Sequence, residues 1–350
     1  MKAIVLKRPG DFSIEEIPTP EPQADEVLIR IHAAGICTND VRDFRGDCTY
    51  SYPRIGGHEY CGTIECLGSA VNAERFSVGQ KVVQYIIDDC KACHYCKRGE
   101  ENICEDFPKT ETFQKPNGIS GYKGFAEYIT AKAGDLYVYP KDARFEDMAF
   151  TEPLACVINS IERAQLRFGD DVLVIGGGTM GMLHVMAAQL KGVRVILSEP
   201  LAERREKALQ LGAAAAIDPI HEDLQARIRE LTEGRGADVV FNTTAIPAIA
   251  GDAVRATAPG GTVIMFSSIH PNTPVPVDLG YVHSYQQEII GAVNPSISSY
   301  HQSVLLIGKK ILSPEPLREA IFDYRDFGQA METAMRPDTY KVLLKFGEIE

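Results

Sequence analysis

The sequence contains no long hydrophobic run: no stretch of about 18 consecutive apolar residues occurs anywhere in its 350 residues. Its start, MKAIVLKRPGDFSIEEIP, has no apolar segment of signal-peptide length and soon turns acidic. Neither a membrane-spanning helix nor a secretory signal is therefore predicted. We expect the protein to reside in the cytoplasm.

The sequence also lacks an excess of positive charge. Lys and Arg number 36 against 48 Asp and Glu, and the formal net charge is -12 at pH 7. This balance disfavours nucleic acid and anionic membrane surfaces as partners, although charge alone says nothing about a substrate. Internal repeats, low-complexity tracts and long linkers are absent as well, so the sequence is typical of a globular protein.

Length and texture predict two domains, because 350 residues exceed what one hydrophobic core usually supports. Up to about residue 150, short alternating apolar runs such as 27–31 and 82–87 indicate β-strands joined by loops. From about Asp170, strand-length apolar runs alternate with helix-length segments, which is typical of a parallel sheet with crossover helices. The expected strands are 172–175, 193–197, 239–241 and 262–266, and the expected helices are 180–191, 202–211 and 223–232. A helix at 328–335 and a strand at 342–346 follow, and this C-terminal part resembles the β-rich pattern of the first 150 residues.

Four of the nine cysteines stand in the run CKACHYCKRGEENIC, with the spacing C-x2-C-x2-C-x7-C. Soft thiolates at short spacings let one loop curl around a single ion, so this spacing indicates a structural zinc site. Two disulfides, an iron–sulfur site or a chance cluster are the alternatives, but the odd cysteine count fits a reducing compartment. The expected zinc ligands are Cys90, Cys93, Cys96 and Cys104.

A glycine-rich loop follows the expected strand at 172–175 directly. Gly176, Gly178 and Gly181 stand in G-x-G-x-x-G register, and a helical pattern begins at once. Glycines in this register permit a tight turn, a pyrophosphate close to the backbone and close helix packing. Glu199, 23 residues after Gly176, ends the next strand, where a carboxylate favours NAD over NADP. Arg204 and the neighbouring Arg205 could accommodate NADP, so NADP is not excluded. The alternative to a dinucleotide site is a glycine-rich turn next to a solvated glutamate.

A second metal site can be assembled from residues that are scattered along the sequence. Cys37 lies in GICTND, His58 and Glu59 lie in GGHEYCG, and Glu152 lies in TEPLAC. A thiolate, an imidazole and carboxylates can hold zinc while leaving a position open for water or a substrate oxygen. Taken singly, each residue has an ordinary explanation as a core residue or a solvated charge.

Together these motifs resemble the zinc-dependent medium-chain dehydrogenase/reductase superfamily over essentially the whole chain. The matching motifs are GIC around residue 37, GHE at 57–59, the four-cysteine run, EPLAC at 152–156 and GGGTMG. Glu152, where classical alcohol dehydrogenases carry a cysteine ligand, resembles the polyol branch of sorbitol, threonine and galactitol-phosphate dehydrogenases.

The resemblance implies an α/β protein with two domains. A GroES-like, mostly β catalytic domain would span residues 1–153 and 290–350 and carry a structural zinc lobe at 88–106. A Rossmann domain with a doubly wound parallel sheet would span 154–289. Members of the family are usually homodimers or homotetramers, with zinc and nicotinamide in the cleft between the domains.

The resemblance also implies a reaction and a set of site residues. Zinc would polarise an alcohol oxygen, a proton would leave, and the carbinol hydride would pass to NAD. The catalytic zinc would be carried by Cys37, His58, Glu59 and Glu152, and Asn39 and Asp40 would complete the catalytic set. The cofactor contacts would be Gly176, Gly178, Thr179, Met180, Gly181, Glu199 and Arg204. With the structural site, two zinc ions are expected per subunit.

Two positions depart from the polyol branch. Asn39 stands where a Ser or Thr hydroxyl normally relays the alcohol proton, and an amide cannot relay a proton in that way. Thr38 is adjacent, but neighbouring side chains usually point in different directions. Proton exit through Glu59, Glu152 or a zinc-bound water is therefore the hypothesis.

The second departure is Asn294, which aligns with an arginine that contacts polyol hydroxyls in sorbitol dehydrogenases. An amide still hydrogen-bonds a hydroxylated substrate but offers no fixed positive fork for an acid or a phosphate, which favours a neutral polyol or sugar. A turn residue before Pro295 is the alternative. At the level of the whole chain, we expect a zinc-dependent NAD-linked dehydrogenase of a secondary alcohol, and the alternative is a non-catalytic dinucleotide- and zinc-binding regulatory protein.

Overall fold

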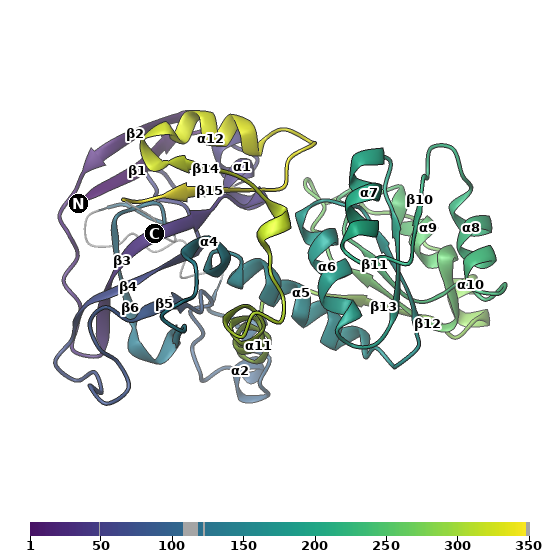
Figure 1. The fold of residues 1–350 in the computed structure, drawn as a ribbon, viewed down its shortest axis with the longest axis horizontal. Coiled ribbons are helices and arrows are strands. Elements are labelled where there is room, and N and C mark those ends of the chain that lie inside the picture. Colours follow the sequence, from purple (N-terminus) through teal and green to yellow (C-terminus); the bar gives the residue numbers. More distant parts are fainter. Residues whose placement is uncertain (49, 108–117, 122, 348–350) are drawn as a thin grey trace. The chain divides into compact units, whose positions relative to one another are not determined.

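The computed structural model describes residues 1–48, 50–107, 118–121 and 123–347 (Figure 1). The chain divides into two compact units, one of residues 1–155 with 295–350 and the other of residues 156–294. The boundaries expected at 153 and 290 differ from this division by a few residues. The first falls inside a continuous helix, α5 (Thr151–Ala164), whose unbroken helical pattern gives no local signal for a boundary. No helix among the described residues combines the length and the apolar character needed to cross a bilayer.

The first unit is built mainly from β-strands, as the alternating texture predicts. A seven-stranded sheet has the order β14-β15-β3-β4-β5-β7, with β6 paired to β3, and β1 pairs separately with β2. The strands are β1 (Lys2–Arg8), β2 (Asp11–Glu16), β3 (Glu26–Gly35), β4 (Glu59–Leu67), β5 (Lys81–Gln84), β6 (Tyr128–Lys132), β7 (Leu136–Val138), β14 (Arg318–Asp323) and β15 (Lys341–Lys345). Thus β14 and β15, from the far end of the sequence, complete the sheet of the N-terminal part.

Among the described residues of this unit, helices are few. They are α1 (Thr38–Arg45), α2 (His94–Lys97), α4 (Phe145–Met148), α11 (Ile297–Gly308) and α12 (Phe327–Ala334), with short 3-10 turns at η1 (Glu101–Ile103), η2 (Ala133–Asp135), η3 (Glu315–Leu317) and η4 (Tyr324–Asp326). Helix α12 packs beside β14 and β15 (Figure 1). The core of this unit consists of aliphatic and aromatic side chains, drawn mainly from β1, β3, β4, β6, β15 and α12.

The second unit has a six-stranded parallel sheet with the order β10-β9-β8-β11-β12-β13. Its strands are β8 (Asp171–Ile175), β9 (Arg194–Ser198), β10 (Ala215–Ile217), β11 (Ala237–Asn242), β12 (Thr257–Met265) and β13 (Glu288–Gly291). Its helices are α6 (Thr179–Gln189), α7 (Ala202–Gln210), α8 (Leu224–Leu231), α9 (Ile249–Ala256) and α10 (Leu279–Ser284). Helices α6 and α7 cover one face of the sheet and α8 and α9 cover the other (Figure 1). This is the doubly wound arrangement that the sequence predicts.

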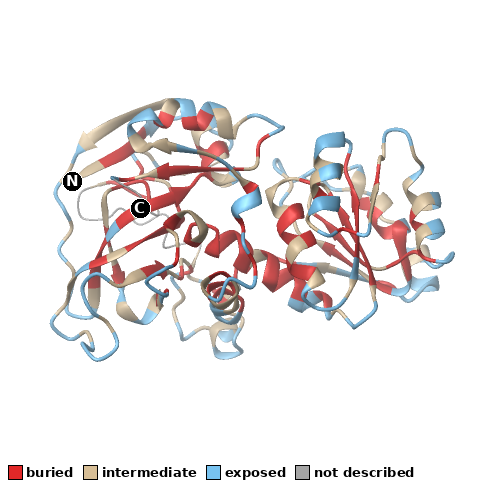
Figure 2. Ribbon diagram, viewed as in Figure 1, coloured by how far each residue is buried: buried red, intermediate tan, exposed pale blue. Residues whose placement is uncertain are grey.

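Burial explains why the sequence of this unit reads as apolar runs. Strands covered on both faces favour apolar side chains at successive positions. Every residue of β8 is buried, and the four that follow Asp171 are apolar (Figure 2). Strand β12 begins five residues before the expected 262, because its first part carries Pro259, Gly260 and Gly261, which sequence patterns assign to a turn. The C-terminal helix and strand lie within a residue of the expected ranges.

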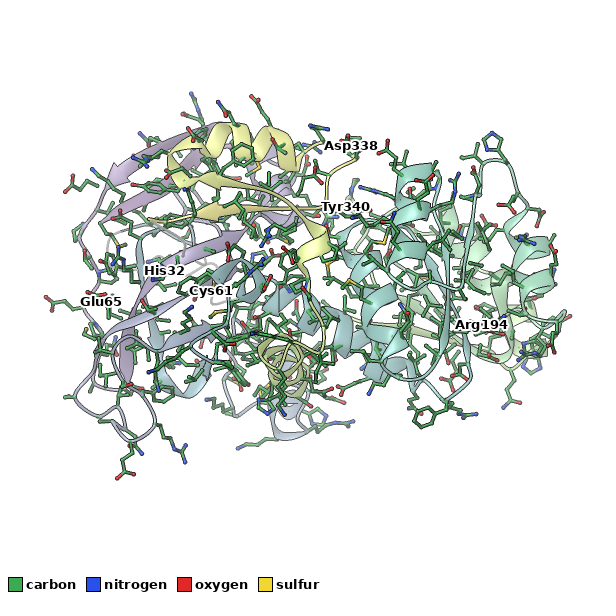
Figure 3. The ribbon with its side chains drawn as sticks, in the orientation of Figure 1. His32, Cys61, Glu65, Arg194, Asp338 and Tyr340 are labelled. Atoms are coloured by element: carbon green, nitrogen blue, oxygen red, sulfur yellow. The ribbon has the colours of Figure 1, made fainter. Side chains whose placement is uncertain are left out.

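Cysteines outside the four-cysteine run include a core residue. Cys61 on β4 is fully buried, and its thiol donates to the Phe145 carbonyl oxygen at 3.1 Å (Figure 3). All nine cysteines are free thiols, so the disulfide alternative for the cluster is wrong.

Candidate functional site

The first unit brings Cys37, His58 and Glu59 together. Their ligand atoms all lie within 4.8 Å of one another. The register of the sheet explains this meeting: β3 ends at Gly35, which pairs with Glu59 at the start of β4, so the segments after one strand and before the other are neighbours. A thiolate, an imidazole and a carboxylate converging in this way fit a zinc ion with an open coordination position.

Asp40 holds the two ligand segments together. One of its carboxylate oxygens accepts the backbone N–H of Cys37 at 2.9 Å, and the other accepts the backbone N–H of Gly57 at 3.0 Å. Cys37 is also the N-cap of α1, where a carboxylate three residues further on completes a capping box. Asp40 is therefore a positioning residue, and both of its oxygens are engaged by the backbone.

Lys341 was not found by sequence reasoning. Its Nζ donates to both carboxylate oxygens of Glu59, at 2.7 and 2.6 Å, and the side chains of Lys341 and Glu59 are 6% and 1% exposed. Lys341 begins β15, 282 residues after Glu59. Burial lowers the pKa of Lys341, but the charges of Glu59 and Cys37 outweigh this effect and raise it. Glu59 is consequently an ion-paired carboxylate.

Glu152 lies in the first turn of α5 and is buried. It stands outside the group formed by Cys37, His58 and Glu59, yet its charge acts on the imidazole of His58. Burial lowers the pKa of His58, whereas Cys37, Asp40 and Glu152 raise it, and the net pKa is well above the ordinary value. The negative charges of Asp40 and Glu152 that act on this imidazole are ones that a bound divalent metal would offset. The donor set therefore fits zinc on chemical grounds as well as on proximity.

The four cysteines of the lobe also converge, and their ligand atoms lie within 4.8 Å of one another. Successive backbone N–H groups point at the sulfurs: Cys93 N–H donates to Cys90 Sγ at 3.2 Å, and Cys90 N–H donates to Cys104 Sγ at 3.3 Å. N–H donors of this kind favour the thiolate, and those of Cys96 and Glu105 lower the pKa of Cys93. Four cysteine sulfurs gathered around one point, once deprotonated by a bound metal, are the donor set of a structural zinc site.

In the second unit, the glycine loop has the geometry that a dinucleotide requires. Gly176 has a left-handed φ of 98°, and Gly178 is the N-cap of α6, followed by Thr179 and Met180 in its first turn. A Cβ on Gly181 would lie 1.8 Å from the Gly176 carbonyl oxygen, whereas a Cβ on Gly178 would meet no atom within 4 Å. Gly181 thus serves close packing, and Gly178 leaves open space at the helix N-terminus where a pyrophosphate binds in such loops.

Glu199, directly after β9, connects to this loop. Its Oε2 accepts the backbone N–H of Gly177 at 2.6 Å, and its Oε1 accepts that of Leu201 at 2.9 Å. Arg205 is used internally, since it pairs with Asp218 at 2.9 Å. Arg204, on α7, is half-buried. Of the two arginines that leave NADP open, Arg205 is therefore committed to an ion pair with Asp218.

Two asparagines were proposed from the sequence. Asn39 lies in the first turn of α1 and is half-buried; its Oδ1 accepts a hydrogen bond from the Tyr50 hydroxyl at 3.3 Å. Asn294 has a left-handed φ of 55°, and its carbonyl oxygen accepts from Asn159 Nδ2 at 2.8 Å. Asparagine tolerates this φ better than most residues, which supports the turn interpretation. A substrate contact by Asn294 stays a prediction.

Two family models match the sequence. The alcohol dehydrogenase GroES-like domain matches residues 23–141, and the zinc-binding dehydrogenase model matches residues 179–308. The first match falls on the mostly β unit, and the second covers most of the parallel-sheet unit and continues through α11. They define the class of protein to which the fold and the ligand groups point, a zinc-type dehydrogenase.

Individual relatives refine this class. A 2-dehydro-3-deoxy-L-galactonate 5-dehydrogenase of Pseudoalteromonas atlantica is 30% identical over 91% of each chain. A sorbitol dehydrogenase of Bacillus subtilis is 28% identical, covering 96% of this chain and 94% of its own. The crystal structure of RspB from Escherichia coli CFT073, described as a short chain alcohol dehydrogenase and complexed with NADH, has a TM-score of 0.88, 27% identity and 99% coverage of both chains. The chain belongs to the zinc-dependent medium-chain dehydrogenase/reductase superfamily, in its polyol branch.

Proposed function

We propose that this protein is a zinc-dependent dehydrogenase that transfers a hydride between a secondary alcohol and NAD. The alcohol is a polyol, a neutral sugar or a related hydroxylated small molecule. The observation that carries the proposal is the convergence of Cys37, His58 and Glu59 on a chain that also has a complete dinucleotide loop. The metal-ligand group lies in the first unit and the loop in the second.

The reaction moves two electrons and one proton. The C–H bond of the carbinol breaks and its hydride goes to the nicotinamide ring, while the hydroxyl proton leaves to a base and then to water. Zinc held by Cys37, His58 and a carboxylate would supply Lewis acidity that lowers the pKa of the hydroxyl. A second zinc, held by the four lobe cysteines, would brace the lobe and take no part in the reaction.

The base is best assigned to Glu152. Both oxygens of Glu59 accept from Lys341, and both oxygens of Asp40 accept from the backbone, so neither carboxylate is well placed to take up a proton. Glu152 is buried on α5 and acts electrostatically on His58. Of the three exits considered from the sequence, we therefore favour Glu152. In E152Q, we expect the rise of kcat/KM with pH to disappear; an unchanged pH–rate profile would rule out this assignment.

NAD is the proposed cofactor, because Glu199 directly follows strand β9 and lies next to the glycine loop. A carboxylate there accepts hydrogen bonds from a ribose 2′-hydroxyl and repels a 2′-phosphate. Arg204 is the residue through which NADP would be accommodated instead. Comparing kcat/KM for the two cofactors in the wild type and in E199A tests this choice, because loss of the carboxylate should erase any preference for NAD.

We also propose a homo-oligomer, at least a dimer, formed through β13. This strand is the last of the six-stranded sheet, and Ile289 on it is 40% exposed. A sheet edge with an exposed aliphatic side chain is a template for pairing with a second strand. Light scattering should show that I289K is smaller than the wild type. The matched control is I321K, because Ile321 lies on β14, an edge strand of the other sheet, and is 37% exposed.

A panel of polyols, neutral sugars and amino alcohols, followed by NADH absorbance, tests the proposed function. We expect turnover of at least one secondary alcohol by the wild type and none by C37S, which loses a metal ligand but keeps the dinucleotide loop. Failure of every secondary alcohol with both NAD and NADP would contradict the proposal. The nine free cysteines support a reducing compartment, the cytoplasm, as the place where the enzyme works.

A further inference from the structure

A chain of polar contacts covers one face of helix α1. Asn39 and Asp43 are four residues apart on this helix and therefore share a face. The segment of residues 50–54 lies against that face. Tyr50 donates its hydroxyl to Asn39 Oδ1 at 3.3 Å, and Arg54 Nε pairs with Asp43 Oδ2 at 2.6 Å.

The middle of this chain of contacts is buried. The side chains of Arg54 and Asp43 are 2% and 5% exposed. Tyr52 adds a second contact to Asp43, its hydroxyl donating to Oδ1 at 2.8 Å. The guanidinium carbon of Arg54 lies 3.9 Å from the centroid of the Tyr50 ring, a cation–π contact. Arg54 is thus anchored to α1 at one end and fixes the ring of Tyr50 at the other, so the Tyr50 hydroxyl is held at a set position above Asn39.

The Tyr50 hydroxyl fixes which end of the Asn39 amide is available. A hydroxyl that donates to Oδ1 engages the carbonyl end of the amide. Among the described residues no acceptor bonds Asn39 Nδ2, and Nδ2 is not one of the fully buried polar atoms that lack a partner. The two N–H donors of Asn39 therefore face space that water or a ligand can enter, two residues after Cys37.

We propose that Tyr50 is a positioning residue which holds the Asn39 amide so that its N–H group donates a hydrogen bond to the substrate oxygen. This proposal rests on the proposed function and deepens it. A donor at this position stabilises negative charge on that oxygen when its proton has left, and equally binds the oxygen of the carbonyl product. Asn39 then contributes as a hydrogen-bond donor, and the proton leaves by another route.

The test uses the variants Y50F and N39A in the zinc-loaded enzyme. Y50F keeps the ring and its contact with Arg54 and removes only the hydroxyl. We expect kcat/KM to fall about tenfold in Y50F, the effect of one lost hydrogen bond to the reacting oxygen. In the N39A background Y50F should have no further effect, because Tyr50 acts only through Asn39. The matched control is Y324F, since Tyr324 also lies beside an arginine, with the Arg325 guanidinium carbon 5.9 Å from its ring centroid.

A second measurement does not depend on turnover. The side-chain amide signals of Asn39 in a nitrogen-15 NMR spectrum, identified by their loss in N39A, should shift in Y50F and stay in place in Y324F. If Y50F and the wild type have the same kcat/KM and the same Asn39 signals, the proposal is overturned. It is also overturned if Y50F lowers kcat/KM equally in the Asn39 and N39A backgrounds, since that indicates a general structural role. Should the wild type turn over no alcohol at all, the proposed function fails, and the NMR result alone then decides whether Tyr50 orients Asn39.

Discussion

Replacing Lys341 by methionine should destabilise the protein strongly. Glu59 and Lys341 are 1% and 6% exposed, and the two oxygens of Glu59 lie 2.7 and 2.6 Å from Lys341 Nζ. Methionine keeps most of the volume and removes the charge. Removing one partner of a buried ion pair leaves the other charge buried without a partner, which lowers the free energy of unfolding by about 3–5 kcal/mol. Against a typical total of about 5–15 kcal/mol, this loss is large.

The double variant E59Q/K341M separates a charge effect from a packing effect. Glutamine has no charge to strand, so most of the lost stability should return, leaving about 1–2 kcal/mol for imperfect hydrogen bonding. The control is K310M: Lys310 and Asp142 are also 2.6 Å apart, but their side chains are 69% and 68% exposed. An exposed pair contributes little, so K310M should unfold as the wild type does.

Urea unfolding followed by circular dichroism is a suitable assay, because the sequence has no tryptophan for fluorescence. The chain has two compact units, so the transition of the first unit must be fitted by itself. A loss below about 1 kcal/mol in K341M would refute the reasoning. The same conclusion would follow if E59Q/K341M were no more stable than K341M.

Three further predictions concern other parts of the chain. His184 is fully buried, and burial lowers its pKa from 6.5 to about 4. Between these two pH values the histidine is protonated in the unfolded chain and neutral in the folded chain. The free energy of unfolding should therefore fall as the pH falls from 6.5 to 4, by up to about 3 kcal/mol more in the wild type than in H184N. Parallel curves of unfolding free energy against pH for the two proteins would contradict this prediction. G178A should keep the wild-type melting temperature and bind NADH more weakly, whereas G181A should melt at a lower temperature because its Cβ would lie 1.8 Å from a carbonyl oxygen. Calorimetry and NADH titration distinguish the two variants. Equal melting temperatures would contradict the prediction. C93S should melt earlier than the wild type while still binding NADH, and unchanged melting would mean that the lobe has no structural zinc.

Sequence reasoning makes its most specific predictions where the chemistry is local. The four lobe cysteines lie between residues 90 and 104, and the glycine loop lies between residues 176 and 181, so a spacing alone predicts each site, and the structure brings the four cysteines together. The alternation of strand and helix in 171–265 follows from burial on both faces of the sheet. Pairing of Cys37 with His58 was accessible only through the resemblance to a family, because the β3–β4 register that brings them together leaves no local signal.

Long-range electrostatics were beyond the sequence. Nothing near Lys341 indicates that it pairs with Glu59, since 282 residues separate them and the contact depends on β15 joining β3. The contact between Tyr50 and Asn39, like the buried pair Arg54 and Asp43 beside it, joins helix α1 to a following loop and leaves no local signal in the sequence. The proposed assignment of Glu152 as the base and the proposed orientation of the Asn39 amide both rest on these contacts and not on the motifs.

Zinc content per chain, measured by mass spectrometry on protein purified without added chelator, tests the central claim most directly. We predict about two zinc ions in the wild type, because Cys37 with His58 and the four lobe cysteines form separate ligand groups. C37S should hold one zinc and lose NAD-linked turnover, with its melting temperature close to that of the wild type. A single zinc in active wild type, or two zinc ions in C37S, would contradict the account of the catalytic site.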